Sequence, residues 1–124
     1  MTRPPSIVHH SAQPLDPNRV LYYTTLMVAI RRTDVFATWL KALRDRAGAA
    51  RIEIRIKRLE LGNPGDHRNL KGGVSELRID FGPGYRVYYT ERNGEIIILL
   101  CGGDKKSQQG DIAQAIAMIG DLED

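Results

Sequence analysis

The sequence predicts an α+β protein in which a helical hairpin precedes a sheet of about four mainly antiparallel strands and a single helix follows it. Apolar residues recur at helical spacing between residues 34 and 59 and again after residue 107. Between residues 75 and 101 the period changes to two, as in half-buried strands, and turn residues divide this stretch into three runs. We therefore expect one folded domain at residues 27–124.

The length of 124 residues corresponds to one domain with a single core. Hydrophobic side chains make up 42% and charged side chains 27%, a balance typical of a folded protein outside membranes, so we expect a cytoplasmic location. Cys101 is the sole cysteine, which excludes an internal disulfide. No Cys/His group has zinc-ligand spacing, and we expect neither a metal nor a cofactor.

Residues 1–26 are expected to be a flexible N-terminal extension, because prolines at positions 4, 5, 14 and 17 interrupt any regular period. The apolar run Val20–Ile30 is too short to cross a bilayer and lacks a signal-peptide cleavage site. Its composition predicts a first strand at about Leu26–Arg31. Because the folded pattern begins at Met27, we hypothesise that residues 1–26 reflect a misassigned start codon.

Two helices should follow the first strand. Thr33 and Asp34 are good N-cap residues, and the apolar spacing after them predicts a helix that reaches about Arg46. Gly48 is expected to separate it from a second helix. The buried stripe of that second helix is Ile52, Ile56 and Leu59. The basic stripe beside it is Arg51, Arg55 and Arg58.

Three consecutive antiparallel strands are predicted next. Ser75–Phe81 alternates apolar and polar residues, and Gly82–Gly84 provide a tight turn into Tyr85–Glu91. An Asn-Gly pair, a strong hairpin signal, then leads into Glu95–Cys101. Its part Ile96–Cys101 is apolar throughout, so we expect this strand to be central and covered on both faces.

A polar segment precedes these strands and a helix follows them. Residues 62–73 are expected to form an exposed, positively charged loop containing His67 and Lys71. Ser107 is expected to cap the final helix. The predicted buried stripe of that helix is Ile112, Ala115, Ile116 and Ile119.

The net charge of +3 is unevenly distributed. Residues 31–92 carry fourteen basic and eight acidic side chains, which leaves an excess of six positive charges. Clustered Lys and Arg gain affinity for polyanions by releasing counterions, so a nucleic acid is one partner class. A solvated basic face without a partner is the other interpretation.

The polar face of the first hairpin could carry a functional patch. A three-residue turn would place Arg78 opposite Tyr88, and Asp80 opposite Arg86. An exposed group of two arginines and a tyrosine suits RNA, because guanidinium groups bind phosphate and a phenol can stack on a base or donate a proton. The alternative is an ordinary Asp80–Arg86 pair with Tyr88 packed beside it.

The segment Gly102–Ser107 combines two glycines with two lysines but lacks Walker A spacing, so nucleotide hydrolysis is not expected. Lys105, Lys106 and free N–H groups at the start of the last helix could hold one phosphate. The alternative is that Asp104 and Ser107 simply cap this helix.

Metal-free chemistry is the enzymatic option that the remaining residues allow. No metal-ligand cluster or Gly-x-Ser-x-Gly motif is present, and Cys101 is expected to be a buried thiol. His67 is either a solvated loop side chain or a general acid or base. On RNA, the substrate's own 2′-hydroxyl would attack, Arg and Lys would stabilise the pentavalent phosphate, and a ribosome could position the substrate.

Six segments, taken in order, match a known family. They are Phe36–Leu43, Arg51–Leu59, Gly62–Asp66, Gly73–Ile79, Gly82–Tyr89 and Leu99–Gln108. They resemble the addiction-module killer proteins, which are toxins of type II toxin–antitoxin pairs in the RelE/ParE superfamily, close to the HigB group. The resemblance covers about Met27–Leu122, so residues 1–26 lie outside it.

The resemblance implies a RelE/ParE-like fold and a small helix-turn-helix antitoxin that neutralises the toxin. Operator DNA would be contacted only through that antitoxin. RelE-like members are mRNA interferases that cut messenger RNA in the ribosomal A site, whereas ParE-like members poison DNA gyrase. We expect a toxin that inhibits translation by ribosome-dependent mRNA cleavage. The alternatives are a gyrase inhibitor and a non-enzymatic nucleic-acid binding module.

The resemblance also implies roles for individual residues. Arg86 matches the phosphate-stabilising arginine, and Arg78 matches a basic position that helps to activate the 2′-hydroxyl. Lys105, or Lys106 one place on, matches a basic residue after the last strand. Glu76 departs from the lysine that RelE-like enzymes often have at its position.

The general acid stays open, because the tyrosine of the RelE-like C-terminal segment has no counterpart after Lys106; Tyr88 and His67 are the candidates. The expected catalytic residues are Arg78, Arg86, Lys105 and Tyr88. The expected substrate-binding residues are Arg51, Arg55, Arg58, Lys71 and Lys106.

Overall fold

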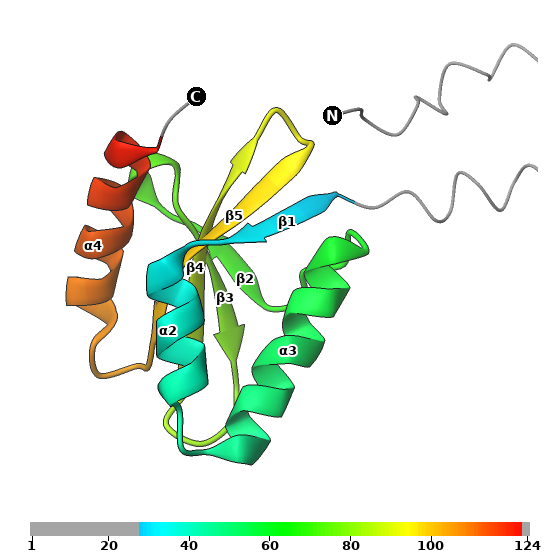
Figure 1. Ribbon diagram of the computed structural model, residues 1–124, viewed down its shortest axis with the longest axis vertical. Helices are drawn as coiled ribbons and strands as arrows, with labels where there is room; N and C mark the ends of the chain where they lie inside the picture. The colour runs from blue at the N-terminus through cyan, green and yellow to red at the C-terminus, as the bar shows by residue number, and fades with distance from the viewer. Residues whose placement is uncertain (1–27, 123–124) are drawn as a thin grey trace, which may run out of the picture.

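A computed structural model describes residues 28–122 of the chain (Figure 1). The predicted extension at residues 1–26 and the start of the predicted first strand lie outside these residues. Within residues 28–122, no helix is long and apolar enough to cross a membrane.

The chain folds as α+β around a five-stranded mixed sheet with the strand order β1-β5-β4-β3-β2. The strands are β1 (Ala29–Arg32), β2 (His67–Asn69), β3 (Ser75–Ile79), β4 (Tyr85–Arg92) and β5 (Ile96–Gly103). β1 runs parallel to β5, and the other neighbours are antiparallel. The prediction of about four strands missed β2, because this three-residue strand is polar and exposed and carries no apolar alternation.

Helices cover both faces of the sheet (Figure 1). α2 (Asp34–Ala42) and α3 (Arg46–Glu60) pack on one face, where Phe36, Ile52 and Leu77 belong to the larger core. α4 (Gln108–Asp121) packs on the opposite face, over a second core that includes Tyr88 and Ala115. A 3₁₀ turn, η2 (Lys71–Gly73), interrupts the segment that was predicted to be a plain loop.

The helical hairpin begins at the predicted N-cap, but its first helix ends before the predicted boundary at Arg46. The Thr33 hydroxyl accepts a hydrogen bond from the Phe36 amide, so Thr33 is the N-cap of α2. α2 ends at Ala42, and Asp45 caps α3 by accepting from the Gly48 amide. The expected break at Gly48 is therefore wrong. Gly48 lies in the first turn of α3, where a side chain would collide with the Tyr85 ring.

The turn between β4 and β5 has the predicted geometry, whereas the turn between β3 and β4 does not. Asn93 and Gly94 have φ values of 56° and 67°, as the predicted primed hairpin turn between β4 and β5 requires. Between β3 and β4, Arg78 pairs with Arg86, and Glu76 pairs with Tyr88. The predicted register is wrong by two residues, because the connection is longer than three residues. A two-residue shift keeps every side chain on its predicted face.

β5 lies inside the sheet and is covered on both faces, as predicted. In α4, Ala115 is buried as expected, and Ile112 and Ile119 pack against the second core. Ile116 is instead 38% exposed, which corrects the predicted stripe. Its side chain lies over Gly72, and Met118 packs against the core.

Candidate functional site

Two arginines face each other across β3 and β4. Arg78 and Arg86 are register partners, so their guanidinium groups project from neighbouring positions on the face that α4 partly covers. Like charges directly opposite on adjacent strands are destabilising. We call Arg78 and Arg86 the arginine pair; the fold must supply a counter-charge for it.

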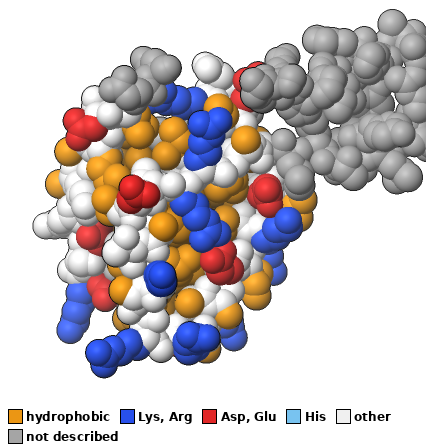
Figure 2. Space-filling view, viewed as in Figure 1, with side chains coloured by type: hydrophobic (Ala, Val, Ile, Leu, Met, Phe, Trp, Pro, Cys, Tyr) orange, Lys and Arg blue, Asp and Glu red, His pale blue; other side chains and the backbone are white. Residues whose placement is uncertain are grey.

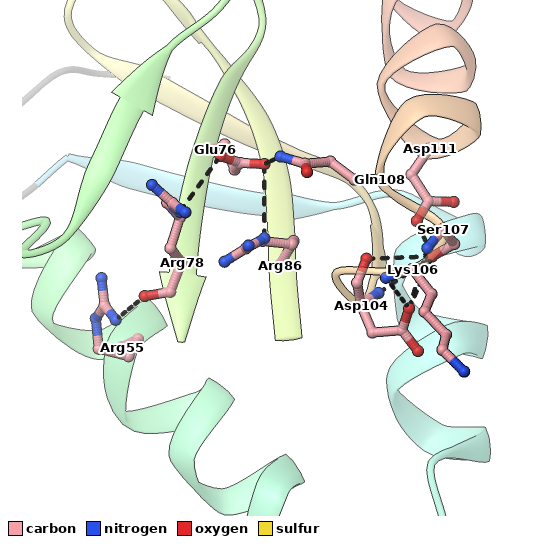
Figure 3. Close-up of polar contacts among 9 residues, drawn as sticks. All are labelled: Arg55, Glu76, Arg78, Arg86, Asp104, Lys106, Ser107, Gln108 and Asp111. Carbon is pink, nitrogen blue, oxygen red and sulfur yellow. Dashed lines mark hydrogen bonds and ion pairs between the residues drawn. The ribbon is translucent and has the colours of Figure 1, made fainter. Parts of the chain in front are cut away.

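Glu76 supplies that charge. Its carboxylate is fully buried and contacts both guanidinium groups (Figure 3). Arg86 Nε is 3.8 Å from Oε2, and Arg78 Nε is 3.9 Å from Oε1. Gln108, at the start of α4, donates a hydrogen bond of 2.7 Å from Nε2 to Oε2. The arginine pair and the N-terminus of α4 are therefore joined through one carboxylate.

Burial contradicts an exposed Arg/Tyr patch and agrees with the alternative in which Tyr88 is packed. The Arg86 side chain is 7% exposed and that of Arg78 29%. Tyr88 is fully buried in the second core, and its hydroxyl has no hydrogen-bond partner among the described residues. Burial, followed by the nearby Glu76 carboxylate, raises the pKa of Tyr88 far above its ordinary value. Tyr88 therefore does not reach the surface from which a substrate would approach.

The segment after β5 holds two exposed lysines. Lys105 lies beside the turn before β4, since a Cβ on Gly84 would be 3.4 Å from the Lys105 Cβ. The Asp104 carboxylate accepts hydrogen bonds from the Lys106 and Ser107 amides, at 2.9 and 3.1 Å. Asp104 therefore occupies the two amides that precede α4, which fits the capping alternative for Asp104, whereas the Ser107 side chain makes no cap hydrogen bond to the helix. In Figure 3 the Lys106 side chain extends away from the arginine pair.

The arginines of α3 differ from one another in their contacts. The Arg55 guanidinium donates hydrogen bonds to the backbone carbonyls of Arg78, Pro64 and Asp66, and burial lowers its pKa. Arg51 lies over the Phe81 ring at 4.5 Å, and Arg58 is exposed.

The predicted substrate-binding residues come from separate elements. The basic stripe belongs to the helix on the sheet face opposite α4, whereas Lys71 is exposed in η2 and Lys106 precedes α4. In Figure 2, basic side chains are interspersed with acidic and apolar ones on the visible face. These residues are therefore not one continuous patch.

The contacts of His67 and the burial of Cys101 bear on whether either residue can take part in catalysis. His67 lies exposed on the edge strand β2, where Nδ1 is 2.8 Å from the Gly65 carbonyl oxygen. Cys101 is buried as expected, and burial, followed by the Asp111 carboxylate, raises the pKa of its thiol to about 12. A thiol with that pKa is not a nucleophile at neutral pH.

Sequence reasoning did not predict that Glu76 and Gln108 meet beside the arginine pair. Alternation placed Glu76 on the polar face of its strand, but the periodicity contains no information about the helix that covers that face. Among the described residues, no group of three or more His, Cys, Asp and Glu side chains could hold a metal ion. The cationic groups that the site can offer to an anion are the guanidinium groups of the arginine pair.

The fold and the arginine pair define a small α+β protein with a cationic site on the face shared with its C-terminal helix. Residues 36–117 match the family of phage-derived proteins called Gp49-like (DUF891), and the chain belongs to this family. The family is of the RelE/HigB-type toxin class of toxin–antitoxin systems. An uncharacterized protein of Haemophilus influenzae is 49% identical over 90 residues, which span 73% of this chain and 91% of that protein.

Proposed function

We propose that this protein is the toxin of a type II toxin–antitoxin pair that inhibits translation by ribosome-dependent cleavage of messenger RNA in the cytoplasm. A helix-turn-helix antitoxin would neutralise it. The observation that carries the proposal is the arginine pair, in which two guanidinium groups share one buried carboxylate and retain an excess positive charge. Membership of the Gp49-like family supports the toxin class.

In the proposed reaction, the 2′-hydroxyl oxygen of a nucleotide attacks the adjacent phosphorus atom. The 2′-hydroxyl loses its proton as it attacks, the bond from phosphorus to the 5′-oxygen breaks, and the departing 5′-oxygen takes up a proton from the general acid or from water. The products are a cyclic phosphate and a 5′-hydroxyl. Arg86 and Arg78 would stabilise the negative charge of the pentavalent phosphate, and Lys105 would add a third cation from the neighbouring segment.

The ribosome would supply the alignment that this small site cannot impose by itself. Because Tyr88 is buried, we assign it a packing role and no proton transfer. His67 is the other candidate for the general acid, its side chain is exposed, and His67→Ala tests it.

The first prediction tests Arg86 in cells. Arg86→Ala should reduce mRNA cleavage by about 10²–10³-fold, because it removes one positioned donor to the developing charge. The measurement maps messenger RNA 5′ ends after induction and follows plasmid supercoiling in the same culture. Arg44→Ala is the control for the loss of an exposed arginine, between α2 and α3, and because Arg86 is buried, circular dichroism checks that both variants are folded.

The possible results separate the alternatives. Translation-dependent cuts that vanish in Arg86→Ala and persist in Arg44→Ala would support the nuclease. Intact messages with altered supercoiling would move the function to gyrase inhibition. Intact messages with unaltered supercoiling and retained RNA binding would instead leave a nucleic-acid binding module.

A further inference from the structure

Glu76 is a buried charge that the reaction proposed above does not use directly. A carboxylate removed from water is costly unless charges and hydrogen bonds compensate it. Here Gln108 donates to Oε2, and one guanidinium Nε lies near each carboxylate oxygen, that of Arg86 near Oε2 and that of Arg78 near Oε1. The carboxylate therefore has one contact to α4 and one to each of two strands.

Both arginines approach Glu76 through the same edge of the guanidinium group. The contacts drawn in Figure 3 run from Nε and are ion pairs of 3.9 and 3.8 Å, and neither Nε has a hydrogen-bond partner among the described residues. In each ion pair, Nε is the guanidinium nitrogen that lies nearest to the Glu76 carboxylate. A guanidinium held by its inner edge keeps its outer N–H groups for a second anion.

The charge balance leads to the same conclusion. One carboxylate offsets one of the two guanidinium charges, so a single positive charge remains for an anionic ligand. Without the carboxylate, the two side chains would repel each other and regain rotational freedom. Anion attraction would then increase while the geometry of the pair would be lost.

We propose that Glu76, held by Gln108, is the positioning residue that orients Arg78 and Arg86 toward a phosphate. This inference rests on the proposed function, because it assigns the oriented groups to the phosphate that is cleaved. Glu76 acts through the arginines and does not itself touch the substrate, since its side chain is fully buried.

Two variants test the proposal. Glu76→Gln retains the shape and an oxygen that can accept from Gln108, but removes the charge. Gln108→Ala retains the charge of Glu76 and removes the hydrogen bond to it. Because Gln108 is only partly buried, we expect this variant to fold, and it tests the proposal even if Glu76→Gln does not fold. The Nε–H signals of the arginines are recorded by ¹⁵N NMR and assigned with Arg78→Lys and Arg86→Lys.

Glu76→Gln should shift the Nε signals of Arg78 and Arg86 and leave that of Arg55 in place. Arg55 is the internal control, because its guanidinium binds backbone carbonyls instead of Glu76. Titration with inorganic phosphate should show an affinity equal to or higher than that of the wild type. Cleavage in cells should fall on the order of 10²-fold, because the pair is misplaced. Gln108→Ala should shift the Arg86 signal by a smaller amount.

Unmoved Nε signals in both folded variants would overturn the proposal. A parallel loss of phosphate affinity and cleavage would also overturn it, because a merely structural role predicts both losses together. A wild-type protein that cuts no message would reject the nuclease. In that case, shifted Nε signals with retained phosphate binding would still support the positioning of the arginine pair by Glu76.

Discussion

Arg55 binds three backbone carbonyls at once, those of Pro64, Asp66 and Arg78. The first two belong to the segment between α3 and β2, and the third belongs to β3. One side chain therefore ties α3 to the strand that carries half of the arginine pair. Because Arg55 binds backbone carbonyls within the protein, a stripe of arginines along a helix does not by itself indicate a nucleic-acid surface.

Arg55→Met should lower the free energy of unfolding by about 1–3 kcal/mol, because it leaves partly buried carbonyls without their charged donor. Methionine retains much of the aliphatic stem, so the loss reports on the guanidinium. Arg58→Met, at an exposed position one turn away, should change the free energy by less than about 0.5 kcal/mol. Urea denaturation measures both, and equal effects of the two variants would contradict the assignment.

At the scale of elements, the end of β5 brings α2 and α4 close to the sheet. A side chain on Gly102 would collide with the Trp39 ring of α2, and one on Gly103 would collide with the Ser107 and Asp111 side chains. The two glycines therefore serve opposite faces of the sheet. Their small size allows α4 to begin where Gln108 reaches Glu76.

Gly103→Ala should destabilise the protein by about 1–3 kcal/mol, because the added methyl group forces the start of α4 outward. Gly120→Ala is the matched control within α4, where nothing lies within 4 Å of an added Cβ. That substitution should stabilise the helix by up to about 1 kcal/mol. Thermal unfolding of both variants is the measurement, and a neutral Gly103→Ala would refute the close approach.

At the scale of the whole molecule, both cores contain groups that must stay neutral. Burial raises the pKa of Cys101 from 9.0 to about 12. Burial, followed by a hydrogen bond to Asp45, raises the pKa of Tyr85 from 10.0 to about 12. The folded state therefore holds protons that the unfolded chain releases between these values.

The free energy of unfolding should accordingly decrease as the pH rises from about 9 to 12. The sign follows because a raised pKa in the folded state gives stability that is fully present below the unfolded pKa and is lost above it. Urea denaturation at several pH values measures the decline. Cys101→Ala should show a smaller decline than the wild type between pH 9 and pH 10, and an unchanged slope would contradict the role of the thiol.

Local chemistry in the sequence predicted the elements that depend on neighbouring residues. Thr33 caps α2, and Asn93-Gly94 closes the β4–β5 hairpin with positive φ angles. The alternation after Ser75 predicted that Arg78 and Arg86 lie on one face of the sheet. This prediction is confirmed although the predicted register was wrong by two residues, because such a shift does not change the face. These features depend on hydrogen bonds and backbone angles within a few residues, which a sequence displays directly.

The tertiary structure decided what each polar residue does. Only the pairing of β3 with β4 makes Arg78 and Arg86 direct neighbours, and only the packing of α4 buries Glu76 and Tyr88. The polar strand β2 exists because it pairs with β3, not because of its own pattern. Periodicity reports which side of an element is polar, but burial and charge pairing depend on what another element places there. The sequence by itself therefore determined the α+β class and the family resemblance, whereas long-range packing determined the geometry of the site.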